Sequence, residues 1–127
     1  MNKYFVIASI TGAIGVILGA LGAHALKNKI SAEQLQSFET GVKYQLYHAI
    51  VLLILAMLID KYAYKYLTWA ANSITIGIVL FSVSIYFLST KTLLGVENLK
   101  FLGPITPIGG LFLITGWLFI ALAFVKK

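Results

Sequence analysis

The stretch "YFVIASITGAIGVILGALGAHAL", residues 4–26, indicates which class of protein this is. It contains no Asp, Glu, Lys or Arg. A helix needs about 20 predominantly apolar residues to cross the hydrocarbon core of a bilayer. The stretch therefore predicts a membrane-spanning helix near the start of the sequence.

Three further apolar blocks follow, at residues 44–59, 67–89 and 105–125. Of the 127 residues, 60% are hydrophobic and 11% are charged, whereas soluble domains average about 45–50% apolar and about 25% charged residues. The connections between the blocks are too short for a soluble domain. We therefore predict an all-α membrane protein, with residues 1–127 forming one transmembrane domain of four helices in a compact bundle.

Small residues recur along the first block with spacings that alternate between four and three. Helices in a membrane associate through close packing and polar contacts, and small residues are enriched where they meet. A mean spacing of 3.5 places the residues on one stripe and is typical of a left-handed helix pair. The predicted packing positions are Gly12, Gly15, Gly19 and Gly22 in the first block, Gly77 in the third, and Gly109 and Gly116 in the fourth.

The connection between the first two blocks, Lys27 to Lys43, is the longest. Ser31 followed by Gln34 matches a capping box, and apolar residues then keep helical spacing at Leu35, Phe38 and Val42. This pattern predicts a short amphipathic helix on the membrane surface between spans one and two. Gly41 is expected to mark a bend where this helix meets span two.

Two short patterns bear on where the spans begin and end. Ala23-His24-Ala25 has the form of a signal-peptide cleavage site, but the apolar run before it is longer than the usual ~7–15 residues. We therefore expect a retained span. Pro104 and Pro107 fit the start of a helix better than its interior, which predicts that the fourth span begins among them.

The composition excludes several classes of site. Without cysteine there is no disulfide, thiolate nucleophile or zinc–thiolate centre. The net charge of +6 comes from ten lysines with no arginine, and the lysines lie near span ends, where they fit lipid headgroups. We therefore expect neither a nucleic-acid partner nor a cofactor.

The lysines divide evenly between the two membrane faces. The face with the termini carries Lys3, Lys61, Lys65, Lys126 and Lys127, and the opposite face carries Lys27, Lys29, Lys43, Lys91 and Lys100. Lysine excess sets orientation in membrane proteins, so this count favours neither side. Our expectation is that both termini lie inside.

The chain has two histidines, His24 at the end of the first block and His48 near the start of the second. Gly41, Gln45 and His48 are four and three residues apart, so they share one stripe of a helix. We predict a His24–Gln45–His48 cluster on the side of the first connection, open toward the headgroups. Tyr47, Ser89 and Thr106 are further candidate ligand-binding residues.

Three interpretations of this cluster are open at this point. The polar groups could satisfy one another as structural hydrogen bonds between helices. They could form a pocket for a small ligand or a lipid headgroup, with a protonated imidazole drawing in an anion. Two histidines without a carboxylate or thiolate make a poor metal site, so we predict no metal.

Catalysis is not expected. The acidic residues Glu33, Glu39, Asp60 and Glu97 all fall in the predicted connections. A serine nucleophile would need a base and an orienting acid, and the spans supply no such acid. We therefore predict no catalytic residue and no enzymatic activity.

Four segments carry a resemblance to a known family. They are "GALGAHALK" at 19–27, "FETGVKYQLYHAI" at 38–50, "FSVSIY" at 81–86 and "LGPITPIGGLFLITGW" at 102–117. The chain resembles the small four-span membrane proteins grouped as domain of unknown function 423, or uncharacterised protein family 0382. The resemblance implies a multi-pass protein of the bacterial plasma membrane and no particular activity. With the termini inside, it would place both termini in the cytoplasm.

These observations predict a non-enzymatic membrane component, either structural or binding lipids or protein partners. The expected partners are membrane lipids, including anionic headgroups, together with a second copy or other membrane proteins. The alternative is an oligomeric channel or carrier for a small solute. It would need oligomerisation because four spans leave hardly any lumen in one chain.

Overall fold

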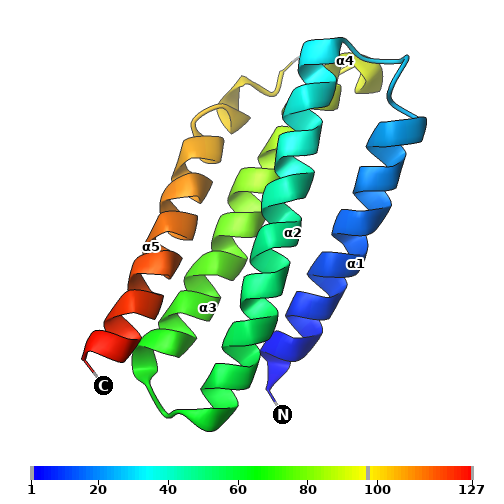
Figure 1. Cartoon of the computed structure of the whole chain (residues 1–127). Helices are drawn as coiled ribbons and strands as arrows, with labels where there is room; N and C mark the ends of the chain where they lie inside the picture. Colours follow the sequence, from blue (N-terminus) through cyan, green and yellow to red (C-terminus); the bar gives the residue numbers. More distant parts are fainter. Residues whose placement is uncertain (1, 97, 127) are drawn as a thin grey trace.

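The computed structural model describes residues 2–96 and 98–126 and contains four helices long and apolar enough to cross a membrane (Figure 1). The first two are α1 (Lys3–His24) and α2 (Ala32–Lys61), and the last is α5 (Ile105–Val125). The third consists of α3 (Lys65–Ile78), a π-helical segment η1 (Val79–Val83) and α4 (Ser84–Leu94). The predicted all-α membrane fold with four spans is confirmed.

The spans follow one another up and down and pack mainly against their neighbours (Figure 1). The two largest contacts join α1 to α2 and α3 to α5, and α2 holds the pairs together by packing on α3, η1 and α4. Large apolar side chains remain on the outer surface, with Ile17 65% and Leu111 62% exposed. In a membrane, lipid covers such apolar faces. Each outer helix therefore has to pack against the other helices on one side only.

Glycines set how closely α1 approaches α2. A Cβ added to Gly15 would lie 2.7 Å from the Leu46 side chain, and one added to Gly19 would lie 3.3 Å from Val42. At Gly22 the nearest atoms belong to the Phe38 ring, at 3.1 Å. The side chains of α2 therefore occupy the space that larger residues on α1 would need.

At the end of the bundle where the two termini lie, Asn2 connects α1 to α2. Its side-chain oxygen accepts from the backbone N–H of Tyr4 at 3.0 Å and caps the helix. Its Nδ2 donates to the backbone carbonyl of Ala56 at 2.9 Å and to Asp60 Oδ1 at 2.8 Å. One side chain thus starts α1 and fastens it to the end of α2.

The helix that we expected on the membrane surface is not a separate element. The predicted capping box is present, because the Ser31 hydroxyl accepts from Gln34 N at 3.1 Å while Gln34 Oε1 accepts from Ser31 N at 3.0 Å. The helix then continues without a break to Lys61. The helix does not bend at Gly41. This glycine instead lets α4 pack closely against α2, since a Cβ added to it would lie 2.8 Å from the Tyr86 ring.

The third span contains a π-helical turn that the sequence pattern did not predict. This segment, η1, lies where α5 comes closest, since a Cβ on Gly109 would overlap the backbone at Phe81 and lie 2.7 Å from the carbonyl carbon of Leu80. π-Turns inside α-helices are rare and occur frequently at functional sites. The start of α5 agrees with the prediction from the two prolines: Pro104 is the N-cap and Pro107 lies in the first turn.

Gly109→Ala should destabilise the protein more than any other Gly→Ala change within the spans. The methyl group would meet backbone atoms, which cannot rotate away, and overpacking of this kind costs about 1–3 kcal/mol. Gly12→Ala is the control, because its Cβ would make an ordinary 3.8 Å contact with Ala49. Thermal unfolding in detergent should show a clear loss for Gly109→Ala and little change for Gly12→Ala. Equal midpoints for the two variants would contradict the assigned packing.

Candidate functional site

Gln45 joins three helices in the interior of the protein. It is buried, with 4% of its surface exposed. Its Nε2 donates to the backbone carbonyl of Thr11 on α1 at 2.9 Å, and its Oε1 accepts from the Tyr86 hydroxyl on α4 at 2.6 Å. An unpaired polar group in hydrocarbon costs several kcal/mol, so these bonds make the buried amide tolerable.

Ser82 and Ser84 make similar bonds around the π-turn. The Ser82 hydroxyl is fully buried and donates to the backbone carbonyl of Gly41 at 2.8 Å. The hydroxyl of Ser84 lies 2.6 Å from that of Thr106 on α5. Both contacts tie the third span to a neighbouring helix, as polar groups commonly do within membranes.

His48 is bonded at both ring nitrogens. Its Nδ1 lies 2.7 Å from the backbone carbonyl of Tyr44, and its Nε2 lies 3.1 Å from Trp117 Nε1 on α5. Indole can only donate and a carbonyl can only accept, so this arrangement assigns a neutral imidazole with its proton on Nδ1. Neither nitrogen is left for a metal or an anion.

The predicted His24–Gln45–His48 cluster is not formed. Gln45 lies opposite Thr11, and His24 is 13 residues further along α1, which corresponds to about 20 Å at 1.5 Å per residue. His24 is exposed at the end of α1. The prediction was wrong because α2 begins earlier than expected, and this places Gln45 beside the middle of α1.

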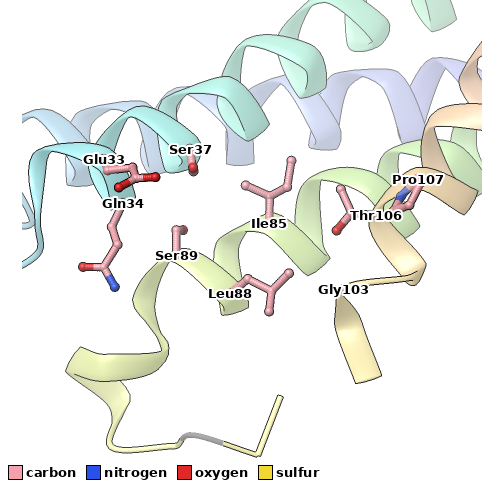
Figure 2. A pocket seen from close by; sticks show the side chains of 9 residues that line it. All are labelled: Glu33, Gln34, Ser37, Ile85, Leu88, Ser89, Gly103, Thr106 and Pro107. Atoms are coloured by element: carbon pink, nitrogen blue, oxygen red, sulfur yellow. The ribbon is translucent and has the colours of Figure 1, made fainter. Parts of the chain in front are cut away.

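The remaining candidates divide between the surface and a pocket. Tyr47 is 57% exposed and lies on the outer face of α2. Ser89 and Thr106 both line a cavity of about 440 Å³ between α2, α4 and the start of α5 (Figure 2). The other lining residues are Glu33, Gln34, Ser37, Ile85, Leu88, Gly103 and Pro107. The structure therefore brings Ser89 and Thr106 together with residues of α2 that sequence reasoning had missed.

A spacing signal for these missed residues was present in the sequence. Glu33, Ser37 and Gly41 follow one another at intervals of four and continue to His48 through Tyr44. Residues three and four apart share a helix face. The prediction of a separate surface helix hid this continuity, because it assigned Glu33 and Ser37 to another element.

The pocket lies close to the level at which α1 ends. Phe38 packs against Gly22, close to the end of α1. Glu33 comes five residues earlier on α2, or about 7.5 Å further along the helix axis. Glu33 therefore lies beyond the end of α1, and Ile85 and Leu88 line the pocket from α4 (Figure 2).

The described residues offer no metal centre, since no three of their His, Cys, Asp and Glu side chains come together as a metal site would require. The pocket and the interior bonds differ in what they leave available. The interior bonds are made among the protein's own groups, whereas the pocket is open to a ligand.

A family model described as "Protein of unknown function (DUF423)" matches residues 18–110. The chain belongs to this family. It is 41% identical over 127 residues to the UPF0382 membrane protein YwdK of Bacillus subtilis (strain 168), covering 99% of this chain and 98% of that protein. It is 33% identical over 112 residues to the UPF0382 inner membrane protein YgdD of Escherichia coli (strain K12), covering 88% of this chain and 81% of that protein. No solved structure matches it.

The family and its names establish a membrane protein of uncharacterised function. They confirm the resemblance that the four sequence segments indicated, and the matched residues include the whole of α2, the whole third span and the start of α5. Gln45, His48 and every residue that lines the pocket lie within this match.

Gln45→Leu should destabilise the protein, because it removes the bond to Thr11 and leaves the Tyr86 hydroxyl without its acceptor. Such a loss is expected to be on the order of 1 kcal/mol. Combining it with Tyr86→Phe should restore part of the stability, since the unpaired hydroxyl is then absent. Unfolding midpoints of the two single variants and the double variant measure this coupling.

Tyr47→Phe is the matched control for these three variants. Tyr47 is exposed on the same helix, so removing its hydroxyl should leave the unfolding midpoint unchanged. Strictly additive effects of Gln45→Leu and Tyr86→Phe would show that the Gln45–Tyr86 bond does not stabilise the fold.

Proposed function

We propose that this protein is a non-enzymatic, lipid-binding component of the bacterial plasma membrane. In this proposal the pocket between α2, α4 and α5 holds the polar end of a membrane lipid. The observation that carries the proposal is the composition and position of the pocket: hydroxyl, amide and carboxylate groups at the end of the bundle where α2 begins, with Ile85 and Leu88 beside them. The E. coli relative is named an inner membrane protein, which supports the location.

The size of the pocket suits a lipid headgroup. Ligand sites usually enclose about 300–1,000 Å³ and combine apolar walls with a few polar groups, and this cavity measures about 440 Å³. In this proposal the headgroup lies at the depth where α1 ends, with Ser37 just inside that depth and Glu33 beyond it.

Two other functions receive less support. A pore through one chain would need an open interior, but the centre is filled by Leu52, Leu55 and Ile74, each at most 1% exposed. Hydrolysis by Ser37 or Ser89 has less support, because no histidine lines the pocket and both nitrogens of His48 are already bonded. Binding requires neither feature. We further propose that both termini face the cytoplasm.

Ser37→Trp should reduce the amount of phospholipid that co-purifies with the protein by several-fold, because the indole would fill the pocket from α2. Gln36→Trp is the control, since Gln36 is exposed in the same turn but does not line the pocket. Lipid per protein is measured by mass spectrometry after extraction in mild detergent, and unfolding midpoints show that both variants are folded. Equal lipid content in the wild type and both variants would reject the proposed site.

A further inference from the structure

The pocket between α2, α4 and α5 has one charged lining residue, and that residue is an acid. Glu33 is the single charged member of the nine lining residues, in a chain with a net charge of +6. It lies in the first turn of α2, but the start of that helix is capped by Ser31 and Gln34. The Glu33 carboxylate is therefore not needed as a helix cap.

The hydroxyl hydrogens of two lining residues are already used within the protein. Ser89 Oγ donates to the backbone carbonyl of Tyr86 at 3.2 Å. Thr106 Oγ1 has the Ser84 hydroxyl at 2.6 Å and the Leu102 carbonyl at 3.4 Å as partners. A hydroxyl has one hydrogen to donate and two lone pairs that accept. The oxygens of Ser89 and Thr106 can therefore still accept hydrogen bonds from a ligand.

Two donors that could serve a ligand in this pocket are committed or missing. Gln34 is held in place because its Oε1 accepts from Ser31 N at 3.0 Å and its Nε2 donates to Thr92 Oγ1 at 3.1 Å. Pro107 lies in the first turn of α5 and has no N–H, so this helix start provides one donor fewer. No cationic side chain lines the pocket, so a phosphate group finds no opposite charge there, whereas a cation finds the Glu33 carboxylate.

From this balance of donors and acceptors we infer that the pocket selects a phospholipid whose headgroup ends in a primary ammonium. The inference rests on the proposed lipid-binding function. A primary ammonium has a positive charge and three N–H donors. It pairs with the Glu33 carboxylate, and the oxygens of Ser37 and Ser89 supply further acceptors. Hydrogen bonds that involve charged groups are about twice as strong as neutral ones, so Glu33 dominates the selection.

The experiment compares three phospholipids that share the same acyl chains. Purified full-length protein is exchanged into detergent micelles containing equal amounts of phosphatidylethanolamine, phosphatidylcholine and phosphatidylglycerol, and retained lipid is counted by native mass spectrometry. The first has a primary ammonium, the second a quaternary ammonium without N–H, and the third no cation. We expect retention to favour phosphatidylethanolamine over phosphatidylglycerol by about tenfold, with phosphatidylcholine between them.

Glu33→Gln should abolish this preference, because the amide keeps the shape of the side chain and removes its charge. Glu39→Gln is the matched control: Glu39 is exposed on the same helix and does not line the pocket. It should retain the wild-type preference. An unchanged preference in Glu33→Gln, or an equal loss in Glu39→Gln, would overturn the inference.

The remaining outcomes separate the inference from the function on which it rests. If phosphatidylglycerol is retained as well as phosphatidylethanolamine and Ser37→Trp releases both, the pocket binds lipids and the ammonium preference is wrong. If the wild type retains no lipid, the proposed function itself fails. Free ethanolamine at millimolar concentration is not expected to displace the lipid, because it lacks the apolar part that contacts Ile85 and Leu88. Displacement by ethanolamine would reassign the site to a soluble amine.

Discussion

The close contact between α1 and α2 determines the depth of the polar groups in the membrane. Gly15, Gly19 and Gly22 let the side chains of Leu46, Val42 and Phe38 approach the backbone of α1, and this sets the axial register of the two helices. Gln45 is thereby placed beside the middle of α1, where it bonds to Thr11. The same register places Glu33 beyond the level where α1 ends. A shift by one turn would move each group by about 5.4 Å and break both arrangements.

Polar residues in this protein have two different physical situations. Gln45, Ser82 and His48 lie inside the helix bundle, and their hydrogen bonds are completed by neighbouring helices. Every described buried side-chain nitrogen or oxygen has a hydrogen-bond partner, as expected in hydrocarbon, where unpaired groups are costly. The pocket residues differ because Glu33 and the hydroxyl oxygens can still accept hydrogen bonds. Stability explains the first group, and a ligand would explain the second.

The π-turn η1 connects these two groups. Ser82 in the turn bonds to Gly41 of α2, and Ser84 directly after it contacts Thr106 at the pocket. α5 approaches the same turn at Gly109 so closely that a side chain would not fit. The turn therefore aligns α4 with both α2 and α5, and these three helices form the walls of the pocket.

Local features of this fold could be predicted from the sequence because they depend on residues that are close together in the chain. The lengths of the apolar blocks predicted four spans, Ser31 and Gln34 predicted a capping box, and the two prolines predicted the start of α5. Features that depend on how helices meet could not be predicted in this way. His48 pairs with Trp117, 69 residues away, and Glu33 shares a pocket with Ser89 and Thr106 because α2 runs unbroken through the expected bend. Such neighbours are selected by the depth and rotation at which whole helices pack, and that packing depends on interlocking side chains from all four spans.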